Sequence, residues 1–337
     1  MPTVTRCLIV LALLAWLPRT ARASPSDTAP SRQTSHTEAN KYRAWRNKVQ
    51  GALIARADAK SLATAAALAA VGRGLKNDPG KPALEALELA TQAIELAPQD
   101  AAIAWLRLSL CAEVPSCDIK GAATVMRWID ADNSAAWLPS LSNAQKDKDA
   151  TDIDRVLADM ARGTRFDLYW NRIAVLMFDA LTRVRTALPR GYAASDSARF
   201  DIVSGIASGE IIPAFSPLVE ICRESAAQSE RRDSCLKLAK VMQHGDTIIA
   251  QLAGFSIERR LVAPDGKEAR LIAERRHVLE WRVSEAAKID APMLPWTKGS
   301  RIRERLAHMR LLPREEDVCL AILRDHKAAI DPPETHP

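Results

Sequence analysis

Cysteine is the residue type whose spacing in this 337-residue sequence points most directly to chemistry. Cys111 and Cys117 lie on either side of a predicted helix break at Pro115, and Cys222 and Cys235 lie on either side of the break "AAQSE". Residues equidistant from the turn of an antiparallel helix hairpin face each other, and a disulfide requires Cα atoms within about 7 Å. We therefore predict two disulfides, Cys111–Cys117 and Cys222–Cys235.

Zinc binding is the alternative use of the same cysteines. A structural zinc module spaces its cysteines as C-x2-4-C and completes the site with further Cys or His residues. The gaps of five and twelve residues do not match that spacing, and no His pair is near. Cys319 is left over within the apolar stretch "DVCLAIL", which favours an inert buried thiol over a nucleophile. The sequence therefore predicts no metal site.

Histidines and carboxylates form no catalytic set along the chain. His277 and Glu280 share one face of a charged helix, His244 lies at a helix end where it suits a capping role, and His308 and His326 are isolated on charged helices. The motifs G-x-S-x-G and H-E-x-x-H and a phosphate-binding glycine loop are missing. We therefore predict no catalytic residue and no cofactor, and the sequence leans against an enzyme, although distant residues can still assemble in space.

The first 23 residues have the order of a secretory signal peptide. Arg6 precedes the apolar run at 7–17, "CLIVLALLAWL", and residues 21–23 form a small-x-small cleavage site. A membrane anchor is the alternative, but a bilayer span needs about twenty apolar residues. We therefore predict cleavage after Ala23, an exported mature chain and a periplasmic location.

Charge excludes several partners once the signal peptide is removed. The full chain is +6, and residues 1–23 contribute three arginines and no acid, which leaves 44 basic and 41 acidic residues. Nucleic-acid binding needs a concentrated basic surface, whereas stretches such as "AERRHVLEW" alternate their charges. We therefore predict no nucleic-acid partner. No later run is apolar enough for a membrane span, and the Ser/Thr/Pro-rich segment 24–40 should be disordered.

The remaining sequence predicts an all-α fold, because strong helix formers fill most windows and alternating β-branched runs are scarce. We expect the mature chain to consist of two regions, helical repeats over 41–190 and a further helical region over 191–330. Residues 264–266, "PDG", suit a β-hairpin turn, but their Arg-, Glu- and Ala-rich flanks favour helix–turn–helix. The helices are expected at 40–57, 60–74, 82–97, 99–113, 118–130, 133–145, 151–162, 167–187, 197–208, 216–228, 230–244, 246–262, 267–288, 300–310 and 314–329.

Three tryptophans recur at a nearly constant interval. Trp105, Trp137 and Trp170 lie 32 and 33 residues apart, and about two predicted helices fall in each interval. Such a period is typical of helical repeats, in which neighbouring hairpins stack and share one core. We therefore expect the tryptophans at equivalent positions on successive first helices, buried between helices. The alternative is an irregular helical domain with tryptophans spaced by chance.

The segment around the first tryptophan resembles the tetratricopeptide repeat family. Ala86, Ala93 and Pro98 match the small, small and closing-proline positions of that pattern, and Trp105-x2-Leu108 matches the opening of the next repeat. The chain departs from the pattern at the following glycine and aromatic positions, which hold Ser109 and Ala112. The resemblance covers roughly residues 60–180 and implies helix hairpins that present a binding surface.

The sequence carries no catalytic motif, so the feature of the predicted repeats that points to a function is their extended binding surface. We expect a scaffold or adaptor that binds another protein or an envelope macromolecule; the alternatives are an envelope hydrolase with a site between the two helical halves and a chaperone-like holdase. Arg107 and Arg172 each follow a tryptophan by two residues and so turn about 200° from it on a helix. They are the partner-binding residues that we predict.

Overall fold

A computed structural model describes residues 32–71, 80–184, 196–224, 229–291 and 298–333. Lys41 and Tyr42 lie on opposite sides of a boundary between two compact units, Met1–Lys41 and Tyr42–Pro337, and the packing described below is that of the second. The predicted signal peptide at 1–23 lies outside the described residues.

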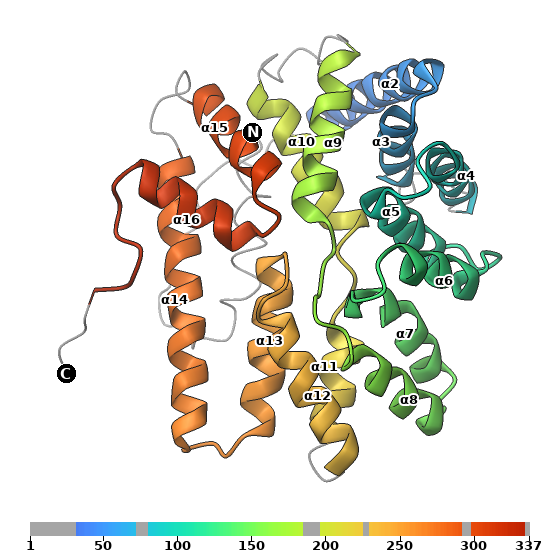
Figure 1. Cartoon of the computed structure of the whole chain (residues 1–337). Helices are drawn as coiled ribbons and strands as arrows, with labels where there is room; N and C mark the ends of the chain where they lie inside the picture. Colours follow the sequence, from blue (N-terminus) through green and yellow to red (C-terminus); the bar gives the residue numbers. More distant parts are fainter. Residues whose placement is uncertain (1–31, 72–79, 185–195, 225–228, 292–297, 334–337) are drawn as a thin grey trace. The chain divides into compact units, whose positions relative to one another are not determined.

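The described residues confirm the all-α prediction, because they contain fifteen α-helices, one 3-10 helix and no strand (Figure 1). No helix among them combines the length and the apolarity that crossing a membrane requires. The helices are α2 (Arg32–Arg56), α3 (Ala59–Ala70), α4 (Gly80–Leu96), α5 (Ala101–Cys111), α6 (Ile119–Ile129), the 3-10 helix η2 (Ser134–Trp137), α7 (Leu138–Lys146), α8 (Ala150–Met160), α9 (Trp170–Arg183), α10 (Asp196–Glu210), α11 (Ser216–Glu224), α12 (Ser229–Met242), α13 (Ile248–Leu261), α14 (Lys267–Asp290), α15 (Lys298–Leu311) and α16 (Glu315–Asp325).

Aspartate begins four of the helices in the first half of the chain. The side chains of Asp58, Asp100, Asp118 and Asp149 each accept a backbone N–H from the first turn of the helix that follows. Such a cap satisfies a donor that has no partner inside the helix, and a carboxylate also interacts favourably with the positive end of the helix dipole. At each of these helices, an aspartate next to the first turn therefore helps to determine where the helix begins.

Of two predictions about element boundaries, one needs correction and the other is confirmed. α2 begins at Arg32, so residues 32–40 are helical and the disorder predicted for 24–40 does not hold for them. Adding residues to an existing helix costs less than nucleating a new one, so a polar segment can extend a helix that is anchored further along. In contrast, the turn at 264–266 joins α13 to α14, which confirms helix–turn–helix over a hairpin.

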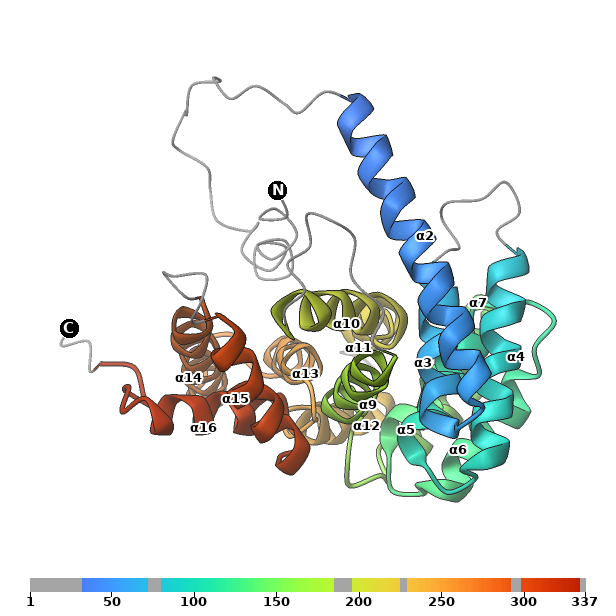
Figure 2. The same ribbon diagram turned by 90° about the horizontal axis from the view of Figure 1, so that it is seen from above.

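The first half of the chain is a succession of helix hairpins. α3 packs on α4, α5 on α6 and α7 on α8, and α4 and α6 contact the helix that follows them. α3 is rich in alanine and buries ten consecutive residues, 61–70, so its neighbours approach it closely. α9 departs from this succession, because it packs on α3, α10 and α15 rather than on the preceding pair (Figure 2).

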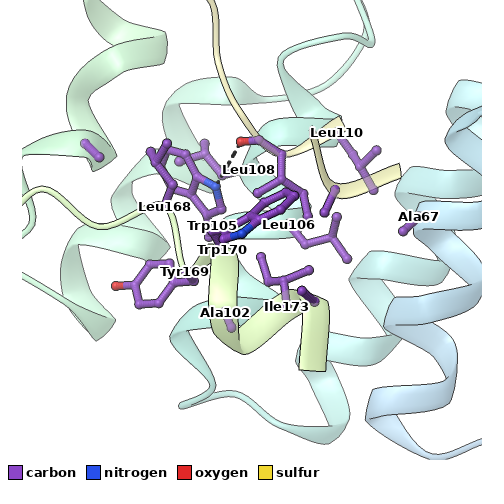
Figure 3. Packing of buried hydrophobic residues seen from close by; sticks show 14 of the residues in the cluster. Ala67, Ala102, Trp105, Leu106, Leu108, Leu110, Leu168, Tyr169, Trp170 and Ile173 are labelled. Atoms are coloured by element: carbon purple, nitrogen blue, oxygen red, sulfur yellow. Dashed lines mark hydrogen bonds between the residues drawn. The ribbon is translucent and has the colours of Figure 1, made fainter. Parts of the chain in front are cut away.

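The three periodic tryptophans do not occupy equivalent positions. Trp105 is the fifth residue of α5, Trp137 is the last residue of η2, and Trp170 is the first residue of α9. The prediction of equivalent positions is therefore wrong. The connections that precede η2 and α9 place the tryptophan at the end of one element and at the start of the other. Burial is confirmed for Trp105 and Trp170, which lie in the same core cluster (Figure 3), and Trp137 is partly buried.

The second half of the chain packs α12 on α13, α13 on α14, and α16 on both α14 and α15. Most of its apolar side chains join the main core, and a smaller cluster lies between α13 and α14. The members of this smaller cluster are Leu252, Phe255, Val262, Ala269, Ile272 and Leu279.

Candidate functional site

The predicted cysteine pairs are at disulfide distance. The Cα atoms are 5.5 Å apart in Cys111–Cys117 and 5.6 Å apart in Cys222–Cys235, which confirms both pairings geometrically. Cys319 is free and buried, and burial raises the pKa of its thiol to about 11. A thiol with that pKa stays protonated at neutral pH, so Cys319 is a poor nucleophile, as the sequence predicts.

A groove of about 750 Å³ lies beside the first disulfide. Its walls come from the end of α5, the loop to α6, α7, and the connection from α10 to α11. The described residues that line this groove are Trp105, Leu108, Ser109, Cys111, Ala112, Glu113, Val114, Pro115, Cys117, Ile119, Leu138, Pro139, Ser142, Asn143, Gln145, Lys146, Gly209, Ile211, Ile212, Pro213, Ala214 and Pro217. The disulfide Cys111–Cys117 closes the loop that forms one rim.

The wall between α10 and α11 is tied to the core by a tryptophan. Trp105 is 2% exposed, and its Nε1 donates a hydrogen bond to the carbonyl oxygen of Ile211 at 3.3 Å (Figure 3). Residues 211–215 adopt neither helix nor strand, so this bond holds an irregular segment at a fixed place. A buried Trp N–H usually has a hydrogen-bond acceptor, and here the acceptor is a backbone carbonyl oxygen in the groove wall.

The groove lining combines apolar surface with hydrogen-bonding side chains. Ser109, Ser142 and Asn143 supply hydroxyl and amide groups, and the charged groups among the described lining residues are Glu113 and Lys146. One carboxylate and one ammonium group give a wall with little net charge. Such a lining suits an uncharged ligand that has both apolar groups and hydrogen-bonding groups.

A polar cluster joins the loop before η2 to the segment before α9. Asn133 Nδ2 donates to the Asp167 carbonyl at 2.9 Å and to the Tyr169 hydroxyl at 3.2 Å, and the Asn133 carbonyl side-chain oxygen accepts Asp167 N–H. Tyr169 also donates its hydroxyl to Asp130, and Arg165 pairs with Asp130 and Asp167. Burial and the bond to Asp130 raise the pKa of Tyr169, so its hydroxyl remains a neutral donor. The cluster fixes two loops to each other.

A distant carboxylate caps α9. Tyr169 precedes this helix with φ of 57° and provides no side-chain cap. Asp246, which lies between α12 and α13, accepts the N–H of Leu168 at 2.8 Å and that of Trp170 at 3.2 Å. Burial raises the pKa of Asp246 well above its usual value, and nearby Glu315 adds to the shift. The start of α9 is therefore set by a residue from the second half of the chain.

The predicted partner-binding arginines lie away from the groove. Arg107 Nε donates to Thr91 Oγ1 at 3.2 Å, which ties α5 to α4. Arg172 Nη2 lies 3.4 Å from Asp100 Oδ1, and its guanidinium is 5.7 Å from the centre of the Tyr169 ring. Neither arginine lines the groove. A partner contact through them remains a prediction.

Two histidines that appear isolated in the sequence lie in one cluster. His308 Nε2 is 2.8 Å from Asp325 Oδ2, and His326 Nε2 is 2.8 Å from Glu304 Oε1. The sequence analysis missed this grouping, because α15 and α16 contribute residues about twenty positions apart. The available signal was Glu304 and His308 four residues apart on one helix face.

Comparison with protein-family models, with curated proteins and with solved structures gives no match to this chain. The arguments about function below therefore rest on its own residues.

Proposed function

We propose that this chain is an exported binding protein whose groove receives an extended segment of another protein of the cell envelope. The observation that carries the proposal is the groove of about 750 Å³ beside the Cys111–Cys117 pair. Ligand pockets in proteins commonly have volumes of about 300–1,000 Å³, so this space suits a short segment rather than a folded domain.

Both walls of the groove support an extended peptide as the occupant. On one side, the peptide groups of Ile212 and Ala214 lie outside any helical hydrogen-bond ladder. An extended segment can be recognised through backbone hydrogen bonds while its alternate side chains enter pockets. On the other side, Ser142 and Asn143 of α7 offer further donors and acceptors. This combination suits a peptide backbone carrying apolar side chains.

The charge of the groove favours a neutral segment. Glu113 and Lys146 are the charged groups among its described lining residues, and their charges are opposite. A polyanion such as nucleic acid requires a concentrated positive surface. A hydrolase site requires a nucleophile with a base and an orienting group, and the described lining residues support binding better than that arrangement.

Two further observations support the compartment and the repeat fold that the proposal assumes. Cysteine pairs at disulfide distance are consistent with an oxidising compartment, which agrees with the signal peptide predicted at 1–23 and with a periplasmic location. The consecutive hairpins α3/α4, α5/α6 and α7/α8 support interpreting this half as divergent tetratricopeptide-like repeats. In such repeats, stacked hairpins carry an extended binding surface.

Site-specific photo-crosslinking tests the groove. A photoreactive amino acid is introduced at Ser109 or Ser142, which line the groove, and at Ser284 on the exposed face of α14 as the matched control. After irradiation of intact cells, the two groove positions should give the same discrete protein adduct and the control should not. Mass spectrometry of the adduct should locate the crosslink in one short segment of the partner.

Two results would count against the proposal. One is the absence of an adduct at both groove positions from a folded, exported protein. The other is labelling at Ser284 equal to that at Ser142, which would mean non-specific contact. If the adduct were instead a small molecule or a sugar chain, the groove would bind a ligand of another class and the peptide proposal would fail.

A further inference from the structure

The junction of α15 and α16 brings together side chains of the types that bind transition metals. Glu304 and His308 lie one helical turn apart on α15, and Asp325 is the last residue of α16. One ligand atom from each of these three residues lies within 4.8 Å of the other two. The two helices pack against each other, as Figure 1 shows, so the grouping is part of a helix interface.

We propose that Glu304, His308 and Asp325 bind a zinc-type divalent ion that joins α15 to the C-terminal end of α16. Zinc accepts imidazole nitrogen at about 2.0–2.1 Å and carboxylate oxygen at about 2.0–2.2 Å. At present His308 Nε2 contacts Asp325 Oδ2 at 2.8 Å, so binding replaces this contact by two bonds to the same ion. Three protein ligands leave the fourth tetrahedral position for water.

The donor set selects among metals. Magnesium and calcium prefer coordination spheres built of oxygen, with six or more ligands. One imidazole and two carboxylates, with room for water, match zinc and its first-row neighbours better. The two carboxylates also balance the two charges of the ion, so that burying part of it costs less free energy.

Neighbouring side chains orient the glutamate. His326 Nε2 lies 2.8 Å from Glu304 Oε1, and Arg301 Nη1 donates to Glu304 Oε2 at 3.1 Å. Groups that hold a ligand in place typically change metal affinity by about 10–100-fold when they are removed. We therefore assign His326 and Arg301 a positioning role rather than a place in the coordination sphere.

The site has a route to solvent. The side chain of Asp325 is 52% exposed, whereas those of Glu304 and His308 are mostly covered. An ion can therefore enter from the side of Asp325 without the helices separating. Exposure also makes Asp325→Asn the variant least disruptive to folding, because it keeps the shape of the side chain and removes its charge.

The experiment uses the full chain after removal of metals with a chelator. Titration calorimetry with zinc chloride should show one ion bound per chain, and zinc should raise the melting temperature. His308→Ala and Asp325→Asn should each weaken binding on the order of 100-fold, since loss of a direct ligand exceeds the loss of an orienting group. Asp325→Asn should melt like the parent without metal, which separates loss of binding from loss of fold.

His277→Ala is the matched control, because His277 is exposed on α14 and does not belong to the cluster. It should bind zinc like the parent. If His308→Ala and Asp325→Asn both bind like His277→Ala, or if the parent binds no zinc, the proposal is wrong. Replacement of zinc by cobalt gives a second readout, because a tetrahedral site should produce visible absorption bands. None of these measurements needs the groove or its partner, so either proposal can fail while the other stands.

Discussion

Helices from the two halves of this chain bury very different shares of their residues. In the first half, α3 buries ten of its twelve residues, mostly alanines, against its neighbours. In the second half, α14 has 24 residues and buries four of them. Its contact with α16 includes an ion pair, in which Arg282 Nη1 lies 2.9 Å from Glu316 Oε1, and Arg282 Nη2 lies 2.9 Å from Oδ1 of Asp331, which follows α16 in the chain.

The placement of ion pairs sharpens this contrast. In α8 of the first half, Arg155 pairs with Asp152 and Asp159 of the same helix, so these pairs support one helix only. In the second half, pairs within one helix, such as Arg276–Glu280, occur beside pairs between helices, such as Arg305 of α15 with Asp290 of α14. The alanine-rich α3 is thus held by apolar packing, whereas the charged helix α14 is held in part by ion pairs to other segments. The regions should therefore respond differently to salt and to pH.

The largest expected effect is that of Trp105→Ala in the apolar half. The variant removes a side chain that is 2% exposed, together with its bond to the groove wall. Replacing a buried aromatic with alanine typically costs about 3–5 kcal/mol of unfolding free energy. Chemical denaturation should show this loss. Trp128→Ala is the control, because Trp128 is 71% exposed on α6; it should change stability by less than about 0.5 kcal/mol. Equal losses would contradict the packing argument.

Asp246→Asn should have the next largest effect, because Asp246 links the two halves. Its two oxygens accept two backbone N–H groups, and Asn can accept with one oxygen only. A buried N–H left without an acceptor costs about 1–3 kcal/mol. Thermal melts in mildly acidic buffer should show the loss. An increase in stability at that pH would contradict the capping role.

The pH dependence of the same variant has a defined sign. Burial raises the folded-state pKa of Asp246 above its unfolded value, so the folded state holds the proton more tightly. Its titration therefore contributes stability below the unfolded pKa, and that contribution is lost as pH rises through the folded pKa. The stability difference between the parent and Asp246→Asn should narrow as pH rises from the unfolded-state pKa of Asp246 through its folded-state pKa, since the variant lacks this titrating group. A widening difference would show that the pKa is lowered instead.

Arg282→Ala should give a smaller loss that depends on salt. Hydrogen bonds to charged groups contribute about 1.5–3 kcal/mol, and partial exposure of Arg282 reduces this to about 1–2 kcal/mol. The stability difference from the parent should shrink in 1 M NaCl, because salt screens the pairs with Glu316 and Asp331. Trp105→Ala measured in the same salt should keep its full difference. If both differences respond alike, the distinction between the two halves is wrong.

The smallest expected effects come from two lysines with left-handed backbone. Lys148 follows α7 with φ of 54°, and Lys327 follows α16 with φ of 51°. Glycine adopts such angles without strain, so each Lys→Gly change should raise stability by roughly 0.4–1 kcal/mol. Calorimetry should show both changes in one transition if the halves unfold together, and in separate transitions if they do not. A loss of stability at either position would contradict the strain argument.

Local signals in the sequence were sufficient to predict many of the helices. Pro98 follows the helix predicted at 82–97, close to the observed end of α4 at Leu96, and the cysteine spacing predicts both pairs. Each of these predictions depends on residues within one turn or one hairpin. Caps, prolines and glycines act at that range, so a single sequence is enough to read them.

Long-range contacts were not predictable in the same way. The cap of α9 comes from Asp246, and the partner of His308 is Asp325 on another helix. Nothing in the residues around Leu168 or His308 specifies these partners, because tertiary packing brings the segments together. The start of α9 was therefore expected at residue 167 rather than 170, and the histidine cluster was missed.

The distant cap of α9 also affects the order in which the helices can form during synthesis. A ribosome makes the chain from its N-terminus. The hairpins α3/α4, α5/α6 and α7/α8 each contain an aspartate cap of their own. The first turn of α9 must wait until Asp246, 76 residues beyond Trp170, has been synthesised. In a nascent chain that stops before Asp246, the hairpins from α3 to α8 have their caps, whereas the N–H groups of Leu168 and Trp170 at the start of α9 lack their acceptor.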